Sequence, residues 1–316
     1  MKHLFGPVNS RRLGLSLGVD LVPAKICNFD CIYCEVGVTT GLTVKRREYS
    51  PTSEIIAELD EFFAELDNKS PGWPDFVTLT SSGEPTLHTG IGEVIRYVKR
   101  QLDIPVAVLT NGSLLSDPQV RLDLLAADIV VPSLDAARPA TLAAINRPAP
   151  ECANPEKIIE GLVSFAEEFG GEIWLEILLA AGVNDSDEDI DALVVAVDRI
   201  RPDRVQLNTV VRPPAESWAR PLPEEKMQAI AERFKNCRVE IVADYSGRAA
   251  KRPKQPERMK ILEMLKRRPC TKTDICEATG LDGADVDRLL NELERSSLIR
   301  ETMHDGRKYY QAAKRR

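Results

Sequence analysis

Strand-like and helix-like segments alternate over the first 248 residues, and this alternation constrains the fold more than any other feature. Short apolar runs predict strands, and amphipathic stretches between them predict helices. Strict alternation implies right-handed crossovers and a parallel sheet. We therefore expect an α/β fold of six main β/α units, a partial barrel that stays open where a (β/α)8 barrel would close. The expected strands are 16–22, 76–80, 106–109, 129–131, 173–178 and 205–207, with 239–242 as a candidate edge strand, and the expected helices are 53–66, 91–101, 118–126, 155–169, 186–200 and 224–234.

Three cysteines lie in one short loop directly after the first expected strand. Cys27, Cys31 and Cys34 have the spacing C-x3-C-x2-C. Thiolates at this spacing can converge on one small iron–sulfur cluster, and such clusters are usually held by four cysteines. Three local thiolates would leave one iron of a [4Fe–4S] cluster open to bind and polarise a small molecule. The spacing therefore favours a [4Fe–4S] cluster that takes part in chemistry.

Two other sites could use the same cysteines. A structural zinc site would need His3 or His88 as a fourth ligand, but zinc knuckles usually use two separated cysteine pairs and this sequence has no second pair. A redox C-x-x-C site at Cys31 and Cys34 leaves Cys27 unexplained. Both alternatives therefore account for less of the pattern than the cluster does.

The other cysteines are scattered along the chain. They are Cys152, Cys237, Cys270 and Cys276. Isolated cysteines usually pack as small apolar residues. We therefore expect core positions for them, with a second cluster as the minor alternative.

Four segments of the chain together resemble the radical SAM superfamily. Tyr33 is the aromatic residue before the last cysteine of the loop. Segment 80–87, TSSGEPTL, follows an apolar run and is similar to the family's GGEP segment, with Ser82 in place of the first glycine. Segments 108–112, VLTNG, and 131–136, VPSLDA, follow in the family's order.

The resemblance implies a partial (β/α)6 barrel with two cofactors, a [4Fe–4S] cluster and S-adenosylmethionine (SAM). It implies that the cluster reduces SAM to methionine and a 5′-deoxyadenosyl radical, which abstracts hydrogen from a substrate. A reductant such as flavodoxin or ferredoxin would supply the electron. Cys27, Cys31 and Cys34 would ligate three irons. The implied SAM contacts are Tyr33 near the adenine, Ser82, Gly83 and Glu84 at the methionyl amino group, and Asn111, Ser133, Asp135 and Asn208 at the ribose, the carboxylate or the substrate.

Most of these residues follow an expected strand, so we expect them to line one mouth of the barrel. Glu176 lies inside the apolar run 173–178, where a carboxylate is costly unless it is paired. It is a candidate for pointing into the barrel toward a ligand, and the alternative is an ordinary edge residue. Arg11 and Arg12 precede the first strand and are candidates to pair with a carboxylate, the alternative being a solvated pair.

A closer resemblance is to proteins related to the wyosine-forming tRNA enzymes. It covers most of residues 5–215. Wyosine-forming enzymes carry a second cluster on cysteines upstream of this loop, and no cysteine precedes Cys27 here. We therefore expect membership of the group but not wyosine formation. The segments that carry the resemblance are 5–14, 16–20, 133–136, 145–148, 207–209 and 212–213.

The end of the chain is similar to a winged helix-turn-helix. We expect a barrel domain at 1–248, a polar, basic linker at 249–256 and a winged helix domain at 257–316. The hairpin turn signal Asp305-Gly306 marks the wing. The expected helices are 258–267, 271–279 and 282–295, and the expected wing strands are 298–302 and 308–311.

Charge is unevenly distributed and bears on partners. The chain has a net charge of −7, but residues 251–316 hold 17 Lys and Arg against 11 Asp and Glu, so the rest carries −13. The expected recognition helix is acidic and poorly suited to phosphates, whereas the linker and wing are basic. RNA or a protein substrate could bind through this domain, and protein docking or a structural role is slightly favoured.

Three functions follow. The first is a radical SAM enzyme acting on RNA, most plausibly tRNA. The second is radical SAM activation or modification of a protein or small molecule. The third is a cluster-bearing transcriptional regulator that senses redox state or SAM. The sequence has no signal-peptide pattern and no apolar run near 18 residues, so we expect a cytoplasmic protein without a membrane partner.

Overall fold

The computed structural model describes residues 1–10, 12–66, 72–243 and 258–313. Arg11 and the expected linker 249–256 lie outside these residues. None of the helices in the described ranges is long and apolar enough to cross a membrane.

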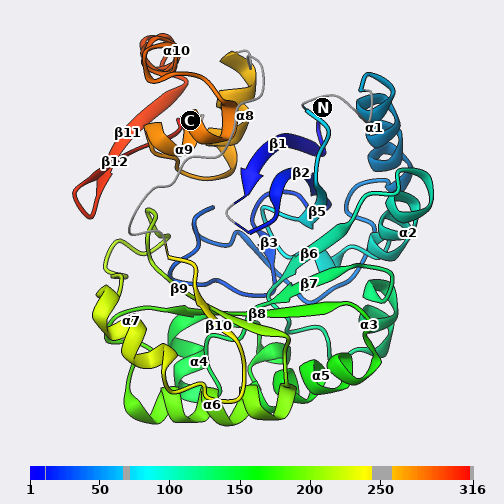
Figure 1. Cartoon of the computed structure of the whole chain (residues 1–316), viewed down its shortest axis with the longest axis vertical. Helices are drawn as coiled ribbons and strands as arrows, with labels where there is room; N and C mark the ends of the chain where they lie inside the picture. The colour runs from blue at the N-terminus through cyan, green and yellow to red at the C-terminus, as the bar shows by residue number, and fades with distance from the viewer. Residues whose placement is uncertain (11, 67–71, 244–257, 314–316) are drawn as a thin grey trace.

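The core of the molecule is a curved eight-stranded sheet, and six of its strands belong to the expected β/α units (Figure 1). Its order is β1-β2-β5-β6-β7-β8-β9-β10. All neighbours from β2 onward are parallel, as the alternation predicts, whereas β1 is antiparallel to β2. Because β1 and β10 form the two edges, the barrel of the described residues is open between them. The strands are β1 (Leu4–Ser10), β2 (Gly14–Asp20), β5 (Phe76–Thr80), β6 (Val106–Thr110), β7 (Ile129–Pro132), β8 (Glu172–Leu179), β9 (Arg204–Thr209) and β10 (Val239–Ile241).

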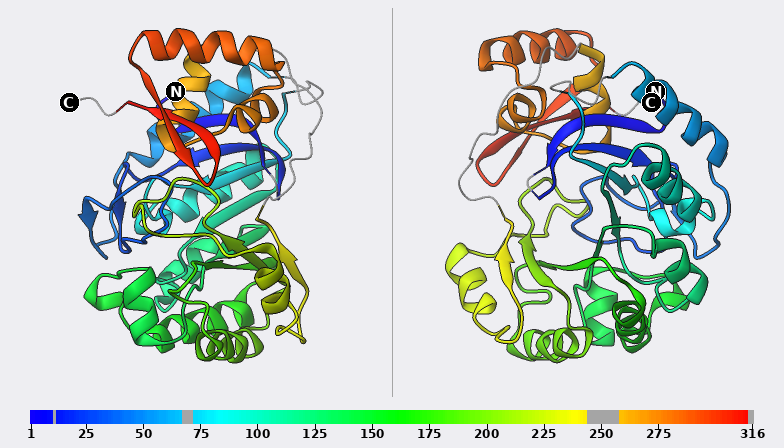
Figure 2. Two further views of the ribbon diagram at one scale, coloured as in Figure 1. Left: turned by 90° about the vertical axis from the view of Figure 1, so that its left-hand side faces the viewer. Right: turned by 45° about the vertical axis from the view of Figure 1, so that its right-hand side comes forward.

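Helices cover the outer face of the sheet (Figures 1 and 2). Their apolar stripes and the strand residues between them form one continuous core. The partial (β/α)6 barrel is therefore confirmed. The helices are α1 (Thr52–Ala64), α2 (Ile91–Gln101), α3 (Pro118–Leu124), α4 (Pro139–Ile145), α5 (Pro155–Glu168), α6 (Asp187–Ile200) and α7 (Glu224–Ala231), with 3-10 turns η1 (Pro85–Leu87) and η2 (Pro150–Cys152) and two short strands, β3 (Ile26–Cys27) and β4 (Gly41–Leu42).

β1 and α4 are among the elements that the sequence patterns missed. β1 contains Gly6 and Pro7, which weaken a strand signal, and its pairing with β2 shifts register between Phe5 and Val8. α4 has only 7 residues, too few for a helical period to emerge. Both are held by tertiary contacts, β1 by its ladder with β2 and α4 by burial of Leu142 and Ile145 in the core.

The C-terminal part has the helix and strand order of a winged helix. Thr271 and Asp274 form a capping box at the start of α9, and Gly280 ends that helix in the left-handed conformation. Asp305 and Gly306 both have positive φ, as a two-residue hairpin turn requires. The elements are α8 (Arg258–Arg267), α9 (Lys272–Thr279), α10 (Gly283–Arg295), β11 (Ile299–His304) and β12 (Arg307–Ala312).

This winged helix packs over the open side of the barrel. α8 and α9 contact β1, and Val8 of β1 packs against the apolar core of the winged helix (Figure 1). The wing reaches the segment after β9, where the Tyr309 hydroxyl donates to the Val211 carbonyl at 2.5 Å and His304 Nε2 lies 3.4 Å from the Val210 carbonyl. The winged helix therefore contacts both sides of the barrel opening.

Candidate functional site

The three cysteines of the loop are half-buried, and each faces an N–H donor. Lys25 Nζ lies 3.1 Å from Cys34 Sγ, Asn146 Nδ2 lies 3.3 Å from Cys31 Sγ, and the Phe29 amide lies 3.4 Å from Cys27 Sγ. N–H donors stabilise the thiolate form that binds iron. The donor set therefore fits a cluster with three protein ligands.

The thiols of Cys27 and Cys31 would be protonated without a metal, because the pKa of each is raised. Burial, and next the nearby Glu84 carboxylate, raise the pKa of Cys27 to about 12. Burial, then Asp135 and the neighbouring cysteines, also raise the pKa of Cys31. Metal ligation requires thiolates and releases their protons, so occupation of this loop is coupled to deprotonation.

The Ser82-Gly83-Glu84 segment lies directly against the cysteine loop. The Lys25 amide donates to the Ser82 carbonyl at 2.8 Å, and the Glu84 amide donates to the Ile26 carbonyl at 3.1 Å. A Cβ on Gly83 would stand 1.8 Å from the Ile26 carbonyl oxygen. Glycine is therefore required at this position by contact with the cysteine loop.

We expect Gly83→Ala to destabilise the protein by about 1–3 kcal/mol, because the new methyl group meets a backbone atom that cannot rotate away. Urea unfolding followed by circular dichroism measures the loss. Gly170→Ala is the matched control, since a Cβ there has no neighbour within 4 Å. Equal stability of the two variants would contradict this packing.

Glu84 is buried and fully engaged within the protein. Its carboxylate accepts from the Thr86 amide at 3.0 Å, the Thr110 hydroxyl at 2.6 Å and the Asn111 amide at 2.8 Å. Burial raises its pKa, although these hydrogen bonds oppose the rise. Glu84 thus ties the end of β5 to the end of β6.

Asp135 is the centre of a second buried network. It accepts from the Tyr33 hydroxyl at 2.5 Å, from Asn146 Nδ2 at 2.7 Å and from the Leu178 amide at 2.9 Å. Burial raises its pKa to about 6 against the effect of these donors. Because Asn146 also faces Cys31, this network connects the ends of β7 and β8 to the cysteine loop.

Asn111 and Ser133 line the same small pocket as Tyr33 and Asp135. Asn111 Nδ2 donates to Asn28 Oδ1 at 2.6 Å and lies 3.8 Å from Cys27 Sγ. Its amide oxygen accepts from Ser113. The sequence-predicted residues at the ends of β6 and β7 are therefore brought together beside the cysteines.

Arg12, Glu176 and Asn208 form a separate cluster inside the barrel. Arg12 and Glu176 form an ion pair, and Asn208 Nδ2 donates to Glu176 Oε1 at 3.2 Å. All three line a cavity of about 370 Å³ that Ser82 also lines. Glu176 thus points into the barrel and has a partner, as its position in a buried strand predicts.

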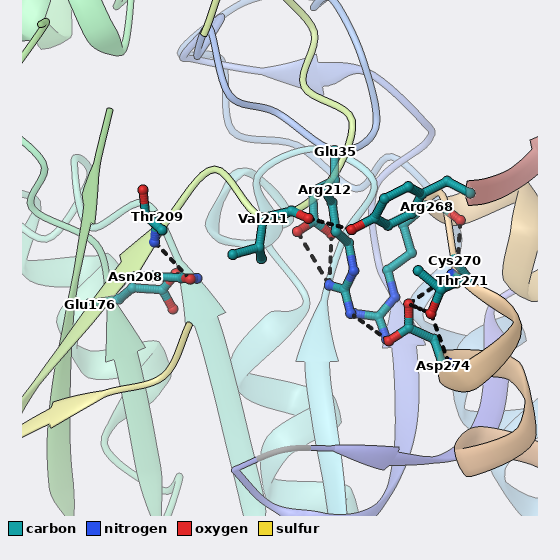
Figure 3. A network of polar contacts seen from close by, with 11 residues as sticks. Glu35, Glu176, Asn208, Thr209, Val211, Arg212, Arg268, Cys270, Thr271 and Asp274 are labelled. Carbon is teal, nitrogen blue, oxygen red and sulfur yellow. Dashed lines mark hydrogen bonds and ion pairs between the residues drawn. The ribbon is translucent and has the colours of Figure 1, made fainter. Parts of the chain in front are cut away.

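Sequence reasoning missed Arg212, which joins three parts of the chain (Figure 3). Its guanidinium, 7% exposed, lies 3.1 Å from Glu35 next to Cys34, and 3.6 Å from Asp274 at the start of α9. Arg212 itself follows β9. The pair Arg212-Pro213 was noted only as part of a family resemblance, and no local pattern pointed to this role of Arg212.

Asp20 and Arg267 were also missed. Asp20 ends β2 and accepts from the Ser82 amide at 3.2 Å and the Ser82 hydroxyl at 3.0 Å. Arg267 of α8 donates to Asp20 at 2.6 Å and stacks on the Phe5 ring at 4.0 Å. The winged helix is therefore linked to the SSGE segment as well as to the cysteine loop.

We expect Arg267→Gln to weaken the contact between the winged helix and the barrel by about 1–3 kcal/mol, because the substitution removes a charge-assisted hydrogen bond and a cation–π contact. Hydrogen exchange of the α9 amides should accelerate. Arg267→Lys should give an intermediate effect, since it keeps the charge but not the planar stack. Unchanged exchange in both variants would argue against this link.

Of the two histidines of the zinc alternative, His88 is not available as a ligand. His88 is fully buried, its Nε2 lies 2.7 Å from the Ser50 carbonyl, and its Nδ1 accepts from the Gly90 amide at 3.0 Å. Within the described ranges no group of three or more His, Cys, Asp or Glu could hold one metal ion. Cysteines of a cluster each bind a different iron, so they need not converge on a single point.

The remaining cysteines occupy cores, as expected. Cys152 is buried in the barrel core and Cys237 packs against it. Cys270 is buried in the core of the winged helix and Cys276 packs against it.

The sequence of the barrel matches a known family. The family model of the radical SAM superfamily matches residues 21–194, more than half of the chain. The chain belongs to the radical SAM superfamily. It is therefore a radical SAM enzyme whose cofactors are a [4Fe–4S] cluster and SAM, and such enzymes need an electron donor. The model of the bacterial regulatory protein arsR family matches residues 255–301, in agreement with the winged helix.

Relatives of this radical SAM protein either carry a family name without an activity or match the chain over only part of their own length. A protein of Methanocaldococcus jannaschii, UPF0026 protein MJ1312, is 29% identical over 98% of this chain and 96% of its own length. UPF0026 protein slr1464 of Synechocystis is 36% identical over 66% of this chain and 76% of its own length. The GTPase Obg of Brachyspira hyodysenteriae is 40% identical over 96% of this chain, but the chain spans only 44% of that protein. The activity in that last name is therefore not transferred to this chain.

Solved structures share the barrel fold. The structure of TYW1 with a lysine-pyruvate adduct bound has a TM-score of 0.51 and 20% identity, covering 73% of this chain and 75% of that one. A radical SAM methyltransferase from Sphaerobacter thermophilus has a TM-score of 0.54 and 15% identity, covering 73% of this chain and 67% of that one. At these identities the likeness concerns the fold alone.

Proposed function

We propose that Cys27, Cys31 and Cys34 hold a [4Fe–4S] cluster at which SAM is reductively cleaved for hydrogen abstraction from a substrate. The observation that carries this proposal is the cysteine loop itself, with three thiols that each face an N–H donor. Such a cluster, with SAM bound, supplies an electron to the sulfonium group and so generates the 5′-deoxyadenosyl radical.

The chain's own residues would position the reactants. Ser82, Gly83 and Glu84 are proposed to meet the methionyl amino group, and their hydrogen bonds to the cysteine loop would fix the distance between the two cofactors. Tyr33, Asn111, Ser133 and Asp135 are proposed to contact the adenosine part of SAM, since they lie together beside the cysteines; the pocket that they share has a volume of only about 10 Å³ and would have to open to admit this group. Arg12, Glu176 and Asn208 are proposed to contact SAM or substrate from the interior cavity.

The winged helix is proposed to exclude water from this interior. Met264, Arg267 and Ala278 line the same cavity as Glu176 and Asn208, so the winged helix forms one of its walls. Keeping water away from a radical intermediate prevents its loss to side reactions.

Partners follow from the same arrangement. We propose a flavodoxin or ferredoxin as the electron donor and a reducing compartment, the cytoplasm, because cluster ligands must remain reduced thiols. The substrate would be RNA or protein reaching the site beside the winged helix. α10 has five acidic residues, counting its cap Asp282, against Arg288 and Arg295, which disfavours phosphate contacts by that helix and also disfavours a DNA-binding regulator.

The proposal is tested by measuring SAM cleavage under anaerobic conditions. The protein is reconstituted with iron and sulfide, reduced with dithionite and mixed with SAM, and 5′-deoxyadenosine is quantified. We expect product only with dithionite present, together with a change in the electron paramagnetic resonance spectrum of the reduced cluster on SAM addition. A fully loaded cluster whose spectrum does not respond to SAM would contradict the proposal.

A further inference from the structure

A cleft of about 570 Å³ opens beside the cysteine loop, and the radical SAM function does not account for it. One wall is the loop segment from Cys34 to Val38, the second is formed by residues between Pro213 and Pro221, and the third is the wing. The cleft therefore runs from a cysteine of the proposed cluster site to the winged helix.

The walls of the cleft combine apolar and polar side chains in about equal parts. They include four prolines and the side chains of Val36, Val38 and Met303. Val38 and Met303 are 54% and 65% exposed, and they are two of the eight large apolar side chains exposed in the described residues. Apolar side chains gathered at one concave surface indicate a binding site.

The charges of the cleft are balanced. Arg220 and Arg300 are matched by Glu35 and Asp305, and no lysine lines the cleft. Nucleic acids are bound mainly through clustered positive charge, which this cleft lacks. Methionine and arginine in a setting without lysine are instead typical of the centres of protein interfaces.

We propose that this cleft binds a polypeptide segment of a partner protein and brings one of its residues next to the cysteine loop. The inference rests on the proposed function, because it names polypeptide as the substrate class of that same site. The wing supplies one wall of the cleft, which gives the winged helix a role in substrate binding that does not need the acidic helix α10 to contact phosphates.

The experiment selects peptides from a displayed random library on the full-length reconstituted protein and measures their affinity by fluorescence anisotropy. We expect Met303→Asp and Val38→Asp, both at residues that line the cleft, to weaken binding of the selected peptides by more than about tenfold. Val195→Asp is the matched control, because Val195 is 60% exposed on α6 and does not line the cleft, and it should bind as the wild type does.

Two results would overturn the assignment. One is unchanged peptide affinity in both cleft variants. The other is tighter binding of a mixed-sequence single-stranded RNA than of any selected peptide, with loss of that binding in Arg300→Gln. The formation of 5′-deoxyadenosine is measured on the same preparation. Unchanged peptide affinity in both cleft variants, on a preparation whose SAM cleavage is intact, would refute the cleft assignment alone, whereas a loaded cluster that does not respond to SAM would refute the proposed function.

Discussion

Cys31→Ser is expected to abolish cluster binding. Cys31 is one of three cysteines on the loop, so its loss leaves too few thiolates for a cluster that is usually held by four ligands. A serine hydroxyl at the buried position facing Asn146 would not ionise near neutral pH. We expect anaerobic reconstitution to yield less than about one iron per chain, against about four in the wild type, with SAM cleavage at background.

Cys237→Ser is the matched control for the loop cysteine. Cys237 is half-buried and packs against the barrel core between α7 and β10, away from the loop. Its substitution should leave the iron and sulfide content and the visible absorption unchanged. A Cys31→Ser protein that still bound four irons and cleaved SAM would exclude Cys31 as a ligand.

Arg212→Gln is expected to lower the free energy of unfolding by about 3 kcal/mol, because it removes the cation between two partly buried carboxylates. The loss would be a large share of the stability of an ordinary protein. Glu35 and Asp274 would then repel one another across the contact between the cysteine loop and α9. Urea unfolding of the full chain measures the change.

The pH dependence of this variant gives a second measurement. Burial acts to raise the pKa of Asp274, but Arg212 and hydrogen bonds from Thr271 outweigh it and hold that pKa below its ordinary value of 3.8. A lowered folded pKa stabilises the protein above the unfolded pKa, and this stability is lost as pH falls through the folded pKa. The wild type should therefore lose more stability than Arg212→Gln on acidification below about pH 4.

Arg233→Gln provides the comparison for Arg212. Arg233 pairs with Asp187 and Asp191 on an exposed surface, where ion pairs contribute about 0–1 kcal/mol. If Arg212→Gln and Arg233→Gln lowered the free energy of unfolding by the same small amount, burial would not strengthen the ion pairs of Arg212.

The fold was largely predictable because its signals are local. The strand Phe76–Thr80 and the helix Ile91–Gln101 were predicted with the bounds that the structure has, since each has a clear apolar period and clear ends. The helices expected at 271–279 and 282–295 begin where they were predicted, because their caps Thr271 and Asp282 contact near neighbours in the chain. β1 could not be predicted, since its place at the sheet edge depends on its pairing with β2.

The residues of the candidate site were likewise predictable only in part. The role of Gly83 was predicted from the approach of a ligand, whereas the structure shows that it contacts the Ile26 backbone, a neighbour that no local pattern reveals. Glu176 was a candidate to point inward from its place in a buried strand, with an ordinary edge residue as the alternative, and its partner Arg12 lies far away in sequence.

The sequence by itself determined the α/β alternation, the three-cysteine loop and the winged helix, because each depends on spacings within about 10 to 20 residues. Only the tertiary structure decided that the winged helix covers the open side of the barrel, and that Arg212 and Arg267 join it to the cysteine loop and the SSGE segment. These ion pairs form between residues separated by up to 247 positions, and their strength comes from burial that the fold creates.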